Sequence, residues 1–315
     1  MAVVKEEFLY RSSVGDCDIH AISWKPKKGT PRGVLQIIHG MAEYVDRYDS
    51  MARYFAEKGY AVYGNDHIGH GKSVNRKYPL GYFGENNENG ATFVKDARLL
   101  TEIAKKENPE IPFILFGHSM GSFLARVYLS EYGDDLDAAI ICGTGDKPSG
   151  LKIALKIADR KAKRRPAKDG ALLNKLAFSS YNKKTKGYTD FDWLSTDEEV
   201  VRQYIKDPLC GFCFSNQGFR DLLTLNRHMV SDDVLVATPK SLPILFVAGT
   251  KDPVGNYGKG VKKTARLYKH ADCNVKVKLY KGDRHEIHNE KNRKEVYKDL
   301  FKFMVETTEK GNKKK

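Results

Sequence analysis

The sequence predicts an α/β protein with a mostly parallel central sheet covered by helices on both faces. Short apolar runs alternate with helical patterns over most of the chain, and most of these runs lack the polar alternation of a half-exposed strand. A length of 315 residues is enough for one large core of this kind. The expected strands are 34–38, 60–63, 113–116, 138–142, 242–248 and 275–280, and the expected helices are 48–57, 90–105, 122–132, 257–270 and 289–308.

Two parts of the chain depart from this alternation. Segments 8–12 and 19–24 are expected to form an antiparallel hairpin at the edge of the sheet. Between about Thr144 and Leu235 the sequence is helical, polar and rich in lysine. We therefore predict a core of residues 1–144 and 236–315, with a helical cap of residues 145–235 inserted after the sixth strand. Loops at that end of a parallel sheet border the functional site, which favours a cap over a surface decoration.

The most informative motif is the Gly-His-Ser-Met-Gly sequence of residues 117–121, which follows an expected strand directly and precedes an expected helix. This context is typical of a nucleophile elbow, a sharp turn that lifts a serine hydroxyl above the sheet. The serine backbone must be strained there, and side chains at Gly117 and Gly121 would collide across the turn. Ser119 is therefore the candidate nucleophile.

A serine nucleophile needs a base to take its proton and an acid to orient that base. Asp252 lies in the turn after the strand 242–248, and His285 lies in the loop after the strand 275–280. Ser119 also follows a strand, so we expect all three side chains to meet at one rim of the sheet. Asp146 and His288 remain alternatives for the acid and the base.

The oxyanion of such a reaction needs two backbone N–H donors. The first is expected from Met120, the residue after the candidate nucleophile. The second is expected from Met41, because a His-Gly pair at 39–40 follows the strand 34–38.

The formal net charge is +14, from 54 basic and 40 acidic residues. Residues 151–165 form a basic amphipathic helix that could contact an anionic membrane surface, or could pack on the core with its lysines outward. No nucleic-acid motif accompanies the charge, so we predict no nucleic-acid partner.

Other sequence features limit the chemistry that the protein can perform and the compartment in which we expect it. Five scattered cysteines suit a reducing compartment, and Cys210 and Cys213 form a lone Cys-x-x-Cys that lacks the further ligands of a zinc site. We find no glycine-rich phosphate loop, and we predict no metal and no organic cofactor. The absence of a signal-like or membrane-spanning apolar run leads us to expect a soluble, cytoplasmic protein.

The motifs together resemble those of α/β-hydrolases of the monoacylglycerol lipase and lysophospholipase type, also called serine aminopeptidase-like hydrolases. The resemblance implies an α/β-hydrolase fold, with Ser119, Asp252 and His285 as nucleophile, acid and base, and with the amides of Met41 and Met120 as oxyanion donors. One departure is Ile68, where the second motif usually has arginine. The matching stretches are 39–43, 66–73, 117–121, 249–254 and 283–286, and cap stretches 192–195 and 207–211 are similar to bacterial members.

We therefore expect a serine carboxylic ester hydrolase that forms an acyl-enzyme and acts on a monoglyceride-like or lysophospholipid-like ester. One alternative is an amidase or aminopeptidase, in which Glu198 and Glu199 of the cap could anchor a free amine. Another is a hydrolase-fold binding protein that has lost its chemistry, although no member of the expected triad is missing.

Overall fold

The computed structural model describes residues 2–185 and 187–312. In this part of the chain the strands form one eight-stranded sheet in the order β1-β2-β4-β3-β5-β6-β7-β8. The first two pairings are antiparallel, and all pairings from β4 to β8 are parallel. The strands are β1 (Val3–Arg11), β2 (Asp18–Pro26), β3 (Gly33–Ile38), β4 (Tyr60–Asn65), β5 (Phe113–His118), β6 (Ala138–Cys142), β7 (Ile244–Gly249) and β8 (Val275–Tyr280).

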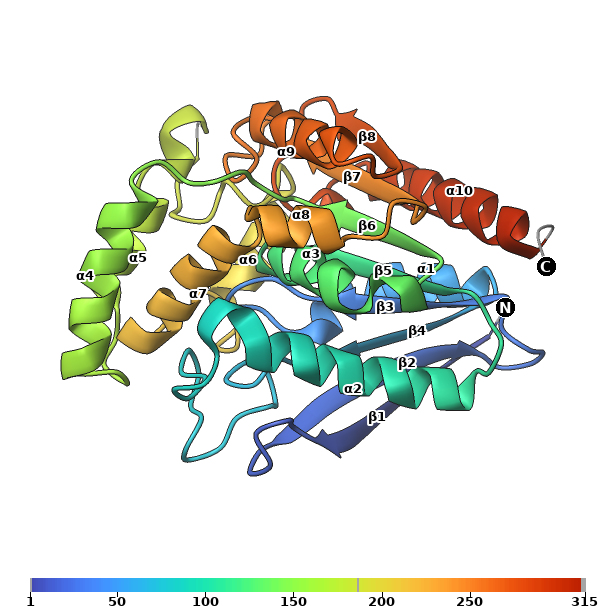
Figure 1. Ribbon diagram of the computed structural model, residues 1–315, viewed down its shortest axis with the longest axis horizontal. Helices are drawn as coiled ribbons and strands as arrows, with labels where there is room; N and C mark the ends of the chain where they lie inside the picture. Colours follow the sequence, from blue (N-terminus) through green and yellow to red (C-terminus); the bar gives the residue numbers. More distant parts are fainter. Residues whose placement is uncertain (1, 186, 313–315) are drawn as a thin grey trace.

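Helices cover both faces of the sheet, as the sequence predicts (Figure 1). One face packs against α1 (Asp49–Glu57) and α10 (Arg293–Asn312), and the other packs against α2 (Ala91–Glu107), α3 (Met120–Tyr132) and α9 (Lys259–His270). The central strands β3 to β7 are buried along their whole length, which explains why their sequences read as continuous apolar runs.

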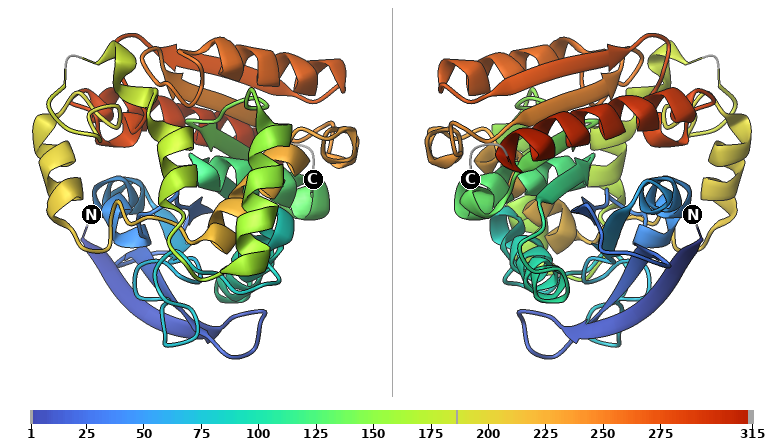
Figure 2. Two further views of the ribbon diagram at one scale, coloured as in Figure 1. Left: turned by 90° about the vertical axis from the view of Figure 1, so that its left-hand side faces the viewer. Right: turned by 90° about the vertical axis from the view of Figure 1, so that its right-hand side faces the viewer.

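The chain between β6 and β7 forms a group of helices at one end of the sheet, with α4 and α5 facing the viewer in the left panel of Figure 2. They are α4 (Leu151–Arg164), α5 (Ala171–Phe178), α6 (Glu198–Lys206), α7 (Asn216–His228) and α8 (Asp232–Ala237). Helices α7 and α8 also pack on α3 of the core. The division at residues 145 and 235 therefore stays a prediction.

Several elements begin at other residues than expected, for local reasons. Strand β1 already begins at Val3 and pairs with β2 along its whole length. It is an edge strand, so it tolerates the exposed charges of Glu6 and Glu7 near its start. Helix α9 begins at Lys259, because Asn256, Tyr257 and Gly258 all adopt positive φ angles that no helix continues. No helix in the described ranges is both long and apolar enough to cross a lipid bilayer.

Candidate active site

Ser119 occupies the sharp turn between β5 and α3. Its backbone has φ 54° and ψ −122°, a strained conformation for a residue with a side chain. The neighbouring backbone leaves no room for side chains, because a Cβ on Gly117 would lie 2.4 Å from the carbonyl oxygen of Gly121, and a Cβ on Gly121 would lie 2.1 Å from that of Ile38. The two glycines are thus required by close approach, and the elbow geometry of the motif is confirmed.

The structure pairs His285 with Asp252. Nδ1 of His285 lies 3.0 Å from Oδ1 of Asp252, and both side chains are buried. Burial disfavours a charged imidazole, but the adjacent carboxylate outweighs this effect, so the pKa of His285 is raised above its ordinary value. The alternative acid, Asp146, forms an ion pair with Lys263 instead. The alternative base, His288, stacks on Tyr48, and burial lowers its pKa to about 3.

Ser119 and His285 both approach the corner at the end of β6. The N–H of Ser119 donates a hydrogen bond of 3.0 Å to the carbonyl of Cys142, and a Cβ on Gly143 would lie 3.1 Å from Cε1 of His285. Nε2 of His285 has no hydrogen-bond partner within the described chain, so it is not bonded to the serine hydroxyl in this state. Catalytic hydrogen bonds of hydrolases often tighten only when substrate is bound.

The loop after β3 lies against the candidate nucleophile, since a Cβ on Gly40 would lie 3.1 Å from Cβ of Ser119. Nδ1 of His39 donates to the carbonyl of Gly40 at 2.8 Å, and its Nε2 accepts from the N–H of His67 at 2.9 Å. Burial lowers the pKa of His39 to about 4, so the ring is neutral at pH 7. Because N–H and C=O point in opposite directions in a trans peptide, this bond fixes the direction of the Met41 N–H.

A buried ionic clamp joins this loop to the loop of His285. Arg47 donates to the carboxylate of Glu43 and forms two hydrogen bonds of 2.8 Å with Glu286, the residue after His285. Glu43 in turn accepts the N–H of Gly40 at 2.6 Å. Burial would raise the pKa of Glu286, but Arg47 outweighs this and lowers it. We call Glu43, Arg47 and Glu286 the clamp.

Aromatic side chains from the segment between β6 and β7 cover His285. The ring of Trp193 lies 5.0 Å from the His285 ring, and the ring of Tyr181 lies 4.9 Å from that of Trp193. The backbone also connects the two segments, because the N–H of Glu286 donates to the carbonyl of Leu194 at 2.7 Å. This apolar cover excludes water from the imidazole–carboxylate pair.

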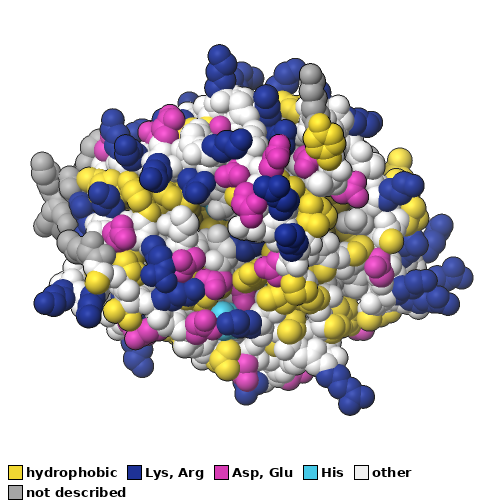
Figure 3. Space-filling view, turned by 180° about the vertical axis from the view of Figure 1, so that it is seen from behind, with side chains coloured by type: hydrophobic (Ala, Val, Ile, Leu, Met, Phe, Trp, Pro, Cys, Tyr) yellow, Lys and Arg dark blue, Asp and Glu magenta, His cyan; other side chains and the backbone are white. Residues whose placement is uncertain are grey.

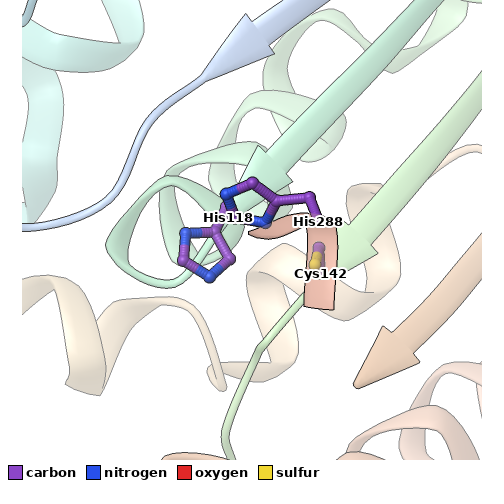
Figure 4. A group of neighbouring side chains, drawn as sticks. All are labelled: His118, Cys142 and His288. Carbon is purple, nitrogen blue, oxygen red and sulfur yellow. The ribbon is translucent and has the colours of Figure 1, made fainter. Parts of the chain in front are cut away.

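A second group of side chains lies behind the elbow, where His118, Cys142 and His288 contribute donor atoms within 4.8 Å of one another (Figure 4). Tetrahedral zinc needs such donors roughly 3.3–3.8 Å apart, given its bond lengths of about 2.0–2.3 Å. His118 already has other contacts, with Nδ1 3.1 Å from the hydroxyl of Tyr48 and Nε2 3.3 Å from the carbonyl of His285. We therefore assign the group to packing and to support of the His285 loop.

Comparison with known proteins agrees with this architecture. The family described as serine aminopeptidase, S33, matches residues 29–292. The chain belongs to this family of α/β-hydrolases.

Two of its relatives and one solved structure are similar over most of their length. A monoacylglycerol lipase of Mycolicibacterium smegmatis is 30% identical over 303 residues, which cover 93% of this chain and 95% of the relative. Mouse monoglyceride lipase is 26% identical over 278 residues, 85% of this chain and 79% of the relative. The crystal structure of a thermostable carboxyl esterase from Bacillus coagulans, in complex with glycerol, has a TM-score of 0.90 at 29% identity and covers 98% of this chain and 99% of that chain.

Two features of the site were missed or misplaced by the sequence analysis. The clamp was not predicted, although Glu43 and Glu286 lie in the motifs 39–43 and 283–286, because nothing in the sequence shows that Arg47 and Glu286, 239 positions apart, form a pair. Glu198 and Glu199 were considered as an amine anchor, but both are exposed on α6, where Glu199 pairs with Arg202.

We predict that Arg47→Met lowers the free energy of unfolding by about 3–5 kcal/mol, because it leaves two buried carboxylates without their cation. Urea unfolding at pH 7 measures the effect. Arg53→Met is the matched control: it breaks a partly exposed ion pair with Asp49 and should cost about 1 kcal/mol or less.

Adding Glu43→Gln and Glu286→Gln to Arg47→Met should recover part of the loss. The unpaired carboxylates of Arg47→Met acquire raised pKa values in the folded state, so its deficit should also shrink as pH falls toward 5. An Arg47→Met protein that is as stable as the Arg53→Met protein would contradict the role of the clamp.

Proposed function

We propose that this protein is a serine carboxylic ester hydrolase that acts through Ser119, His285 and Asp252 and forms an acyl-enzyme. The observation that carries the proposal is the convergence of three strand ends. A strained serine follows β5, and a buried imidazole after β8 lies 3.0 Å from a carboxylate after β7. Membership of a hydrolase family supports the same reading.

In the proposed reaction, the hydroxyl oxygen of Ser119 attacks the acyl carbonyl while Nε2 of His285 takes its proton. Asp252 orients the imidazole and stabilises its charged form. The negative charge on the carbonyl oxygen is received by the N–H groups of Met41 and Met120. His285 then protonates the leaving alcohol, and a water activated by the same ring releases the acid and restores Ser119.

We propose a monoacylglycerol-like or lysophospholipid-like ester as the substrate. The aromatic cover over His285 supplies an apolar surface for an acyl chain, and two relatives are named as lipases of this class. The amidase alternative has less support, because the acidic residues considered for an amine anchor face solvent.

Replacement of the nucleophile tests the proposal. Ser119→Ala should lower kcat for a nitrophenyl acyl ester by on the order of 10⁴ and leave the thermal unfolding midpoint within a few degrees. An aminoacyl anilide should be hydrolysed far more slowly than the ester by the unmodified protein. A strong preference for the anilide would favour the amidase, and a folded protein that hydrolyses neither compound would favour the inactive binding protein.

The pH dependence tests the imidazole–carboxylate pair. His285 must be neutral to act as base, so kcat/KM should rise with pH and reach half its plateau above about pH 6.5, because the Asp252 carboxylate raises the pKa of the ring. Asp252→Asn should move this midpoint to lower pH and reduce the rate by on the order of 10⁴. Asp146→Asn is the control and should change neither the midpoint nor the rate. A lower midpoint in the Asp146→Asn variant would assign the role of the acid to Asp146.

A second proposal concerns peripheral contact with an anionic membrane. The apolar stripe of α4, formed by Leu151, Leu155, Ala158 and Ala162, is buried, so its lysines face outward. Ile153 on α4 is nevertheless 68% exposed, and Leu172 and Leu176 on α5 are 50% and 59% exposed. Seen from behind, basic side chains are mixed with acidic and apolar ones over most of the face and gather at its right-hand edge (Figure 3). Exposed leucine and isoleucine beside lysine suit the boundary of an anionic bilayer.

Vesicle sedimentation tests this contact. The protein should bind phosphatidylglycerol vesicles, and binding should weaken as sodium chloride rises from about 0.05 to 0.5 M, because salt screens the lysines. Combined Ile153→Ser and Leu176→Ser should reduce binding, whereas Val236→Ser, which removes a similarly exposed side chain from α8, should not. Equal binding to neutral phosphatidylcholine vesicles would contradict the electrostatic part.

A further inference from the structure

The loop that follows β3 contains a strained residue next to the proposed oxyanion donor. Ala42, the residue after Met41, has φ 52°, in the left-handed region that residues with a Cβ rarely adopt. The residue is also 96% buried in a tight turn. A residue keeps such a conformation only where the surrounding structure holds it.

The contacts that hold Ala42 come from the segment between β6 and β7. Its carbonyl oxygen accepts two hydrogen bonds, one of 3.0 Å from the hydroxyl of Tyr204 on α6 and one of 2.9 Å from the N–H of Gly211. Both donors lie more than 160 residues further along the chain. The proposed oxyanion loop is therefore held by hydrogen bonds from the segment between β6 and β7, which is distant in sequence.

The side chain of Tyr204 is buried and packs against two other side chains. Its ring packs 4.8 Å from the guanidinium of Arg47 and 5.1 Å from the ring of Phe191, and the residue is 6% exposed. Gly211 can approach this ring because it has no side chain: a Cβ there would lie 3.2 Å from the Tyr204 ring and 3.1 Å from the ring of Phe191.

The left-handed turn at Ala42 has a direct consequence for the peptide before it. It reverses the chain, so that the carboxylate of Glu43 returns to the N–H of Gly40. On the other side, His39 holds the carbonyl of Gly40. His39 thus holds the carbonyl of the Gly40–Met41 peptide, and Glu43 holds the N–H of the peptide before it. The direction of the Met41 N–H therefore depends on the turn at Ala42 that brings Glu43 back to Gly40.

We infer that Tyr204 is a positioning residue for the oxyanion amide of Met41, through its hydrogen bond to the carbonyl of Ala42. The inference rests on the proposed function. It further requires that α6 packs against the loop after β3 for the oxyanion site to form. Tyr204 itself need not touch the reacting atoms.

Tyr204→Phe tests this inference, because it removes the hydroxyl and keeps the ring that packs on Arg47. We expect kcat for an acyl ester to fall roughly tenfold with KM unchanged, since a displaced N–H weakens binding of the charged transition state more than binding of the neutral ester. The rate of labelling by a fluorophosphonate, which also places an oxygen in this site, should fall by a similar factor.

Tyr44→Phe is the matched control. The Tyr44 hydroxyl also joins the loop after β3 to the segment between β6 and β7, through a 2.6 Å hydrogen bond to Asp207, but it does not contact Ala42. This variant should lose a comparable amount of thermal stability and keep kcat. An unchanged kcat in Tyr204→Phe, or equal losses of kcat in both variants, would overturn the inference.

The same experiment separates this inference from the proposed function. If the unmodified protein hydrolyses esters and Ser119→Ala abolishes the activity, the proposed function stands whatever Tyr204→Phe does. If Ser119→Ala has no effect on ester hydrolysis, the proposed function fails, and the inference about Tyr204 fails with it.

Discussion

The candidate site depends on how closely the backbone packs around Ser119. The turn between β5 and α3 can close only because Gly117 and Gly121 lack side chains, and the resulting contact places Gly121 directly against the carbonyl of Ile38 at the end of β3. The turn at Ser119 and the loop after β3 are therefore parts of one packed unit. A parallel sheet provides this arrangement because the ends of β3, β5 and β6 lie side by side at the same edge.

Buried charge provides the second constraint. Two sets of ion pairs lie around the site: His285 with Asp252, and Arg47 with Glu43 and Glu286. A buried ion pair contributes little net stability, but loss of one member is costly, so such groups fix geometry more than they add free energy. In this protein the clamp joins the loop after β3 to the loop of His285. The segment between β6 and β7 contributes two further contacts: Trp193 covers the ring of His285, and Tyr204 donates to the carbonyl of Ala42.

The sequence predicts the parts of this architecture that depend on local patterns. Continuous apolar runs locate β3 to β7, and the glycines at 117 and 121 identify the turn, because their cause is steric and local. Strand β1 was placed too late along the chain because the three consecutive charged residues Lys5, Glu6 and Glu7 resemble a loop. The clamp and the bond from Tyr204 to Ala42 could not be read from the sequence, because each depends on how distant segments dock.

In the proposed reaction, acyl transfer passes through the oxygen of Ser119. The most direct measurement is peptide mass spectrometry after an acid quench of the protein during turnover of a slowly deacylated ester. We expect an added acyl mass on the peptide that contains Ser119, formed and lost at rates that match turnover. Turnover with no acylated peptide, or with the acyl group on a different side chain, would contradict it.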